Sequence, residues 1–142
     1  MSSTYVIREF GIDDYESVYR LWSVTPGLGL SAGDDSREGV EKFLRRNPGM
    51  SFVAEENGNI AGAILCGHDG RRGYIHHTCV AESARGKGVG SKLTAAALDA
   101  FRREGIPKAK LVAFADNAKG NGFWEHMGFT ERPDLIYRDK AL

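Results

Sequence analysis

The segment Arg85-Gly86-Lys87-Gly88-Val89-Gly90 constrains the fold of this chain more than any other part of the sequence. It follows a strand-like run over residues 74–80 and precedes a long stretch in which apolar residues repeat at helical spacing. Glycines at alternate positions let backbone N–H groups converge, the start of a helix adds partial positive charge, and Arg85 and Lys87 add full charges. The segment therefore predicts a phosphate-binding turn between a strand and a helix, with a flexible turn carrying solvated charges as the alternative.

Two common phosphate-binding loops do not fit this segment. The P-loop pattern G-x-x-x-x-G-K-[ST] is absent, and the dinucleotide pattern G-x-G-x-x-G fails because the third glycine comes one residue early. The strands that precede the turn also indicate an antiparallel meander, whereas a Rossmann fold needs parallel strands there.

Periodicity and turn residues predict the other elements. The dipeptide Asn57-Gly58 tolerates positive φ and favours a two-residue hairpin between strands 51–56 and 59–67. The expected order is strand, two helices, three strands, helix, strand, helix and terminal strand material. The long helix carries its apolar face over residues 89–101 and is stopped by Gly105 and Pro107. The remaining ranges are 5–9, 15–22, 36–46, 74–80, 110–115, 118–127 and 129–138. This order predicts a mixed α/β (α+β) fold.

Composition limits the class of protein. A chain of 142 residues with 42% hydrophobic residues predicts one domain over residues 1–142. Nineteen basic and nineteen acidic side chains give no net charge, and no apolar stretch approaches the roughly 20 residues of a membrane span, so we expect neither nucleic acid nor a membrane as partner. Two cysteines without an export signal predict reduced thiols and a cytoplasmic location.

The glycine-rich turn and its flanking residues resemble a known family. Arg85-x-x-Gly88-x-Gly90 after the strand 76–80, followed by Asp116-Asn117 and the segment 122–129, resembles the GNAT superfamily of acyl-coenzyme A (acyl-CoA) dependent N-acetyltransferases. The resemblance spans about residues 5–137, and its specific motifs lie within residues 74–129. It implies a single GNAT-like domain with a mixed, mostly antiparallel sheet of six or seven strands and about four helices.

The resemblance also implies a co-substrate and its contacts. Acetyl-CoA would bind with its pyrophosphate on the amides from Gly86 to Ser91, while the main chain of Thr78 to Val80 would pair with the pantetheine arm. Asn117 matches a position that often contacts pantetheine. Trp124 stands where many members carry a tyrosine that protonates the departing thiolate, and packing in the core is the alternative role for Trp124. The expected cofactor-binding residues are Thr78, Cys79, Val80, Arg85, Gly86, Lys87, Gly88, Val89, Gly90, Ser91, Asn117 and Trp124, and no metal is expected.

Acetylation of an amine needs a base, because an alkyl amine has a pKa near 10 and is protonated at neutral pH. Strand alternation predicts that His76 and His77 point to opposite faces. His76 matches a position where arylalkylamine N-acetyltransferases carry a histidine in a proton relay, so His76 is the expected base, with Tyr74 as its relay or orienting partner. The N–H of Thr78 is the expected oxyanion donor. A structural role for His76 as a half-buried strand residue is the alternative.

The acceptor, a small-molecule or peptide amine, is less constrained. The loop 26–34 and the helix start after it would cover the acceptor, and Trp22, Asp34 and Asp35 could receive an aromatic or cationic amine. The alternative is a solvated acidic helix start stabilised by the helix dipole.

Two other functions compete with catalysis. A non-catalytic acyl-CoA sensor is suggested by Trp124. A structural zinc domain would follow if residues 66 and 79, and residues 68 and 77, paired across neighbouring strands and brought Cys66, His68, His77 and Cys79 together. The sequence leaves the oligomeric state open, a homodimer included.

Overall fold

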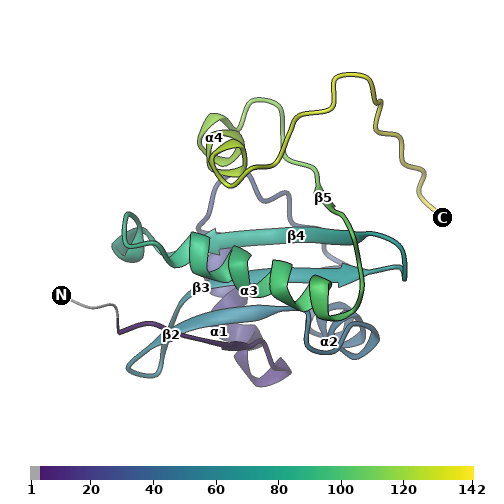
Figure 1. Ribbon diagram of the computed structural model, residues 1–142. Helices are drawn as coiled ribbons and strands as arrows, with labels where there is room; N and C mark the ends of the chain where they lie inside the picture. The colour runs from purple at the N-terminus through teal and green to yellow at the C-terminus, as the bar shows by residue number, and fades with distance from the viewer. Residues whose placement is uncertain (1–3) are drawn as a thin grey trace. The chain divides into compact units, whose positions relative to one another are not determined.

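The computed structural model describes residues 4–142, which divide into two compact units, residues 4–112 and 113–142 (Figure 1). The first unit contains β1 (Val6–Glu9), a 3-10 turn (Ile12–Asp14), α1 (Tyr15–Ser23), α2 (Arg37–Arg46), β2 (Phe52–Glu56), β3 (Asn59–His68), β4 (Gly73–Val80), a second 3-10 turn (Glu82–Ala84), α3 (Val89–Arg103) and β5 (Ala109–Leu111). The second unit contains α4 (Ala118–His126). In the part of the chain from residue 4 onward, no helix has both the length and the apolar character that crossing a membrane requires.

The five strands form one sheet in the order β1-β2-β3-β4-β5. The first four are antiparallel neighbours, and β5 pairs with β4 in parallel. The predicted mixed, mostly antiparallel sheet is confirmed, but its expected six or seven strands are five among residues 4–142, because residues 129–138 form no strand. Pro133 lies in that segment and cannot donate a ladder hydrogen bond.

Helices cover both faces of this sheet, with α3 on one face and α1 and α2 on the other (Figure 1). The face under α1 and α2 carries the larger apolar cluster, in which Trp22 and Val40 meet Val53, Leu65 and Cys79 of the sheet. On the other face, a side-chain carbon at Gly73 would lie 2.8 Å from the Phe101 ring, so α3 approaches the sheet closely there.

The predicted hairpin is confirmed at Asn57-Gly58. Both residues have positive φ, 52° and 81°, and Glu56 pairs with Asn59 across the turn. These values match the left-handed conformations of a type I′ turn, which suits the twist of the flanking strands.

A β-bulge interrupts the pairing of β3 and β4. Ile64 pairs with Thr78 and Cys66 pairs with Ile75, so two residues, His76 and His77, stand opposite Leu65 alone. An extra residue in one strand breaks the alternation of side chains between the two faces. The bulge therefore decides where the two histidines point.

Candidate active site

The bulge places both histidines on the face of the sheet that α1 and α2 cover. The His76 ring lies 5.3 Å from the Phe43 ring of α2, and the His77 ring lies 4.9 Å from the Trp22 ring of α1. The prediction that these histidines point to opposite faces was wrong, because simple alternation does not hold across a bulge. Tyr74 shares the face of His76 as predicted, with ring centroids 4.4 Å apart.

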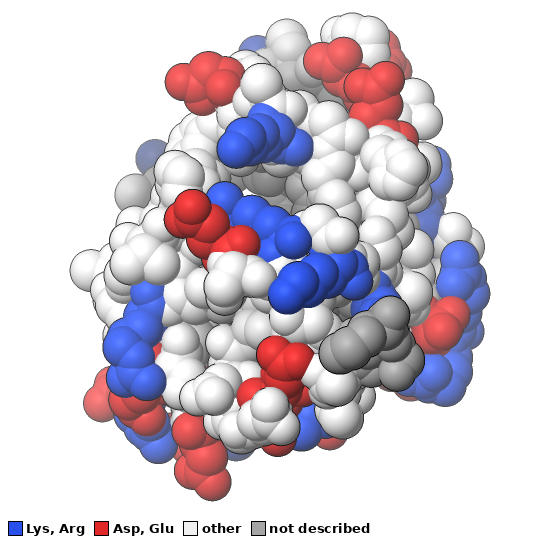
Figure 2. Space-filling view, turned by 90° about the vertical axis from the view of Figure 1, so that its left-hand side faces the viewer, with Lys and Arg blue, Asp and Glu red and all other residues white. Residues whose placement is uncertain are grey.

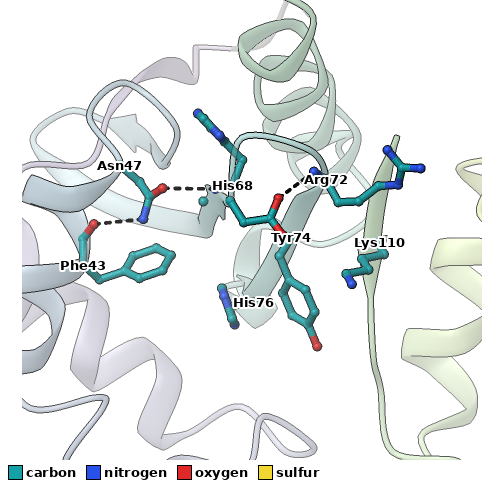
Figure 3. A pocket seen from close by; sticks show the side chains of 9 residues that line it. Phe43, Asn47, His68, Arg72, Tyr74, His76 and Lys110 are labelled. Atoms are coloured by element: carbon teal, nitrogen blue, oxygen red, sulfur yellow. Dashed lines mark hydrogen bonds between the residues drawn. The ribbon is translucent and has the colours of Figure 1, made fainter. Parts of the chain in front are cut away.

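His76 and Tyr74 line a cavity of about 300 Å³ beside the N-terminal half of β4 (Figure 3). Its walls come from the end of α2, the turn between β3 and β4, and β5. Figure 3 shows the Tyr74 and His76 rings side by side, with the amino group of Lys110 turned toward Tyr74. The lining residues are Phe43, Asn47, Gly67, His68, Asp69, Arg72, Tyr74, His76 and Lys110.

The surroundings of His76 favour its neutral form. Partial removal from water lowers the pKa of His76, and the neighbouring His77 lowers it further, while Asp35 and Asp34 have a smaller opposite effect. A neutral imidazole can accept a proton. The structure thus places at the cavity wall an imidazole whose neutral form is favoured.

His77 is held by Asp35 on the segment between α1 and α2. Its Nε2 lies 2.9 Å from Oδ1 of Asp35, whose other carboxylate oxygen accepts a hydrogen bond of 2.7 Å from the Ser31 amide. The Tyr15 hydroxyl donates to the Asp35 carbonyl at 2.6 Å. These contacts link the segment before α2 to the bulge, and no local pattern around Asp35 or His77 predicts them.

The expected acceptor residues are not gathered on one surface. Trp22 is 1% exposed and Asp35 is 6% exposed, so both lie inside the protein, whereas Asp34 is exposed. The expectation that Trp22 and Asp35 receive an amine is therefore corrected: Trp22 packs in the core, and Asp35 turns inward to bind His77 and the Ser31 amide.

The edge of β4 opens after a short pairing with β5. Only Gly73, Tyr74 and Ile75 pair with β5, and within residues 4–142 no other strand pairs with this edge. The Ala81 amide donates to the Ala61 carbonyl at 2.7 Å, so by alternation the main-chain groups of Thr78 and Val80 point away from β3. The Thr78 amide, the expected oxyanion donor, thus faces the open edge.

The Cys79 thiol and the Thr78 hydroxyl, on the part of β4 beside the open edge, are both buried. Cys79 is buried in the cluster under α1, and burial raises the pKa of its thiol to about 12. The Thr78 hydroxyl is buried and has no hydrogen-bond partner in the described part of the chain. By the same alternation the Cys79 main chain faces β3, so of these two residues only Thr78 offers main-chain groups to a ligand at the edge.

The glycine-rich turn continues from this edge into α3. Gly86 and Gly88 have φ of 76° and 79°, a conformation that glycine adopts without strain. The Lys92 amide makes a 3.0 Å bond to the Gly88 carbonyl, so Val89 and Gly90 in the first turn carry amides that the helical ladder does not use. Figure 2 shows this end of α3, with a row of Lys and Arg side chains across the middle of the face.

Residues of the turn differ in exposure. Arg85, Gly86, Lys87 and Gly88 are exposed, Gly90 and Ser91 are half-buried, and the Val89 side chain is buried against the sheet. The Arg85 Nε donates to the Val80 carbonyl at 3.3 Å, which links the turn to the end of β4.

Two expected cofactor residues belong to the second unit. Asn117 caps α4, and its side chain accepts a hydrogen bond of 3.0 Å from the Gly120 amide. Trp124 lies edge-on to Phe123 and Phe129, at 4.9 and 5.3 Å between ring centroids. Within this unit, Trp124 thus forms an aromatic cluster.

The register rules out the zinc alternative. Cys66 pairs with Ile75, His68 with Gly73 and Cys79 with Ala63, so the four side chains do not meet as two opposed pairs. The expected pairing was wrong because it centred the turn on Arg72-Gly73, whereas the pairing of His68 with Gly73 centres the turn on Gly70-Arg71.

Sequence reasoning missed most of the cavity wall. Asn47 comes directly after the predicted helix 36–46; it is 6% exposed, and its side-chain Oδ1 accepts a hydrogen bond of 3.0 Å from the His68 amide. Arg72 and Lys110 are separated by 38 positions and meet only because β5 returns beside β4. A polar residue at a helix end followed by a strand was the only available signal, and it is a weak one.

A mixed sheet whose fourth strand opens beside a glycine-rich helix start, with helices on both faces, is the arrangement expected of an acyl-CoA dependent N-acetyltransferase. The chain belongs to the acetyltransferase (GNAT) family, whose model matches residues 15–129. An acetyltransferase of Pectobacterium atrosepticum is 32% identical over 136 residues, covering 96% of this chain and 94% of that protein. The chain is thus an N-acetyltransferase.

Solved structures agree in fold. Ard1 from Thermoplasma volcanium has a TM-score of 0.81 and 27% identity, covering 90% of this chain and 84% of that one. The PaiA N-acetyltransferase from Thermoplasma acidophilum, in complex with coenzyme A, has a TM-score of 0.79 and 19% identity, covering 92% and 91%. At that identity the second likeness concerns the fold alone.

Proposed function

We propose that this enzyme transfers the acetyl group of acetyl-CoA to a primary amine by direct attack within a ternary complex. One observation carries the proposal: β4 has a proton acceptor, His76, beside a cavity at one end and an open main-chain edge leading to a glycine-rich turn at the other. The cavity would receive the amine, a small molecule or the end of a peptide.

The chain offers suitable groups for acetyl-CoA. Amides from Gly86 to Ser91, together with Arg85 and Lys87, would hold the pyrophosphate, since a helix start with positive charge is a site for anions. The outward main chain from Thr78 to Val80 would pair with the amides of the pantetheine arm, as an added strand does. Gly86 and Gly88 fit this role, because a side-chain carbon at either would meet nothing within 4 Å and the space over the turn is open.

Acetyl-CoA supplies a thioester, whose carbonyl carbon bonds to the amine nitrogen while the carbon–sulfur bond breaks and the sulfur leaves as a thiolate. His76 accepts the proton that the amine loses, and Tyr74 orients the imidazole through ring contact. The Thr78 amide stabilises the oxyanion as charge develops on the carbonyl oxygen. A thiol pKa near 8.5 makes the thiolate a tolerable leaving group, so tryptophan at position 124 is compatible with turnover.

Replacement of His76 tests the proposal. His76→Ala should lower kcat/KM by about 10² to 10⁴-fold at neutral pH, as loss of a general base does, while calorimetry shows nearly unchanged affinity for coenzyme A. His126→Ala, the same substitution at an exposed histidine of α4, is the matched control and should keep full activity. Full activity of His76→Ala with every acceptor would contradict the assignment of the base, and coenzyme binding without turnover in the unaltered enzyme would contradict the proposed reaction.

A further inference from the structure

The cavity beside His76 has a distribution of charge that bears on the acceptor. Two of its lining residues, Arg72 and Lys110, are cations, and neither forms an ion pair with a carboxylate anywhere in residues 4–142. The Arg72 guanidinium donates a hydrogen bond of 3.0 Å to the carbonyl of the neighbouring Arg71. Lys110 Nζ lies 6.0 Å from the centre of the Tyr74 ring. Both charges are available to a ligand.

The only carboxylate in the cavity wall is already used by the turn. One oxygen of Asp69 accepts the amides of Arg71 and Arg72, each at 2.8 Å. Glu104, outside the wall, lies 3.3 Å from the His68 ring. A dicationic acceptor such as a polyamine would face the two cations and the Asp69 carboxylate, which is already hydrogen-bonded within the turn. The second positive charge of the acceptor would therefore be repelled.

Resting on the acetyl transfer proposed above, we propose that the acceptor is a small amine that carries a carboxylate, held by Arg72 and Lys110 while His76 receives the proton of its amino group. The geometry suits such a molecule. The Tyr74 ring lies between the two ends, 4.4 Å from the His76 ring and 6.0 Å from Lys110 Nζ. A volume of about 300 Å³ lies at the lower end of the range of small-molecule pockets, which suits a short amino acid.

A series of matched acceptors tests this inference. Each ω-amino acid from glycine to 6-aminohexanoate is compared with the alkylamine of the same length that lacks the carboxylate. Charge-assisted hydrogen bonds predict that kcat/KM of the best amino acid exceeds that of its alkylamine by about tenfold or more, mainly through KM. An alkylamine or polyamine preferred at every length would overturn the inference without affecting acetyl transfer itself.

Two double variants assign the effect to these side chains. Arg72→Gln with Lys110→Gln should abolish the advantage of the carboxylate, so that the ratio of kcat/KM for the amino acid to kcat/KM for its alkylamine falls to about one. The control, Arg71→Gln with Lys108→Gln, removes the same charge from exposed neighbours outside the cavity wall and should keep the advantage. If both double variants lost the advantage of the carboxylate equally, the advantage would come from the net charge of the protein, and the proposed carboxylate site at Arg72 and Lys110 would be wrong.

Calorimetric titration of the same acceptors gives a readout without turnover. Tighter binding of the amino acid than of its alkylamine, lost in the cavity variant alone, supports the site even if no transfer is seen and the proposed reaction fails. Equal or weaker binding of the amino acid overturns it.

Discussion

Removing the Asp35 side chain should destabilise the protein while leaving its surface chemistry almost unchanged. Asp35 is 6% exposed and accepts from the Ser31 amide at 2.7 Å and contacts His77 Nε2 at 2.9 Å. Asp35→Ala leaves both groups without this acceptor, and each lost partner costs about 1–3 kcal/mol. We therefore expect a loss of about 2–6 kcal/mol in the free energy of unfolding, or roughly 6–20 °C in Tm for a chain of this size.

Denaturant unfolding followed by tryptophan fluorescence measures this loss, because Trp22 packs against His77. Asp34→Ala is the matched control: Asp34 is exposed, and its removal should change stability by no more than about 0.5 kcal/mol. Asp35→Asn keeps an oxygen acceptor and should lose less than Asp35→Ala. Equal stability of the two alanine variants would refute the reasoning, and a raised acceptor KM in a fully stable Asp35→Ala would return Asp35 to the acceptor site.

Two further predictions concern the ligand sites. Gly90→Glu places a carboxylate in the first turn of α3 and should abolish coenzyme A binding in calorimetry; unchanged affinity in a folded variant would remove the phosphate site from this turn. Because burial and His77 lower the pKa of His76, the base is deprotonated at a lower pH than free histidine, so kcat/KM should rise with pH through a value below about 6.5 and then level off. His76→Ala should lose that rise, and its persistence would point to another base.

Features decided by neighbouring residues could be predicted from the sequence. Asn57-Gly58 carries its turn preference in its own backbone, and the helix start at Gly88 follows from the adjacent glycines and the apolar repeat after it. In both cases the decisive interactions lie within a few residues, and local pattern is then sufficient.

Features that depend on contacts between residues far apart in the sequence could not be predicted in this way. The bulge at His76-His77 arises because Ile64 and Cys66 of β3 pair with Thr78 and Ile75 of β4. No residue type within β4 predicts the extra residue. From the sequence alone, Asp35 resembles an ordinary acidic residue at a helix start. Its contact with His77, 42 positions later, is visible only in the folded chain. The terminal strands failed for a related reason, because an apolar run such as Leu135 to Tyr137 forms a strand only where a sheet edge accepts it.

The short pairing between β4 and β5 has a consequence for the motions of the sheet. Three residue pairs, beginning at Gly73 and Ala109, attach β5, and it has a strand neighbour on one side only. Edge segments with few hydrogen bonds open locally at a small free-energy cost, so β5 belongs to the least protected part of the sheet. A ligand that touches Tyr74 of β4 and Lys110 of β5 at once favours the paired state by mass action. Occupation of the cavity and closure of this sheet edge are thus thermodynamically coupled, and a bound acceptor slows the exchange of the β5 amides with water.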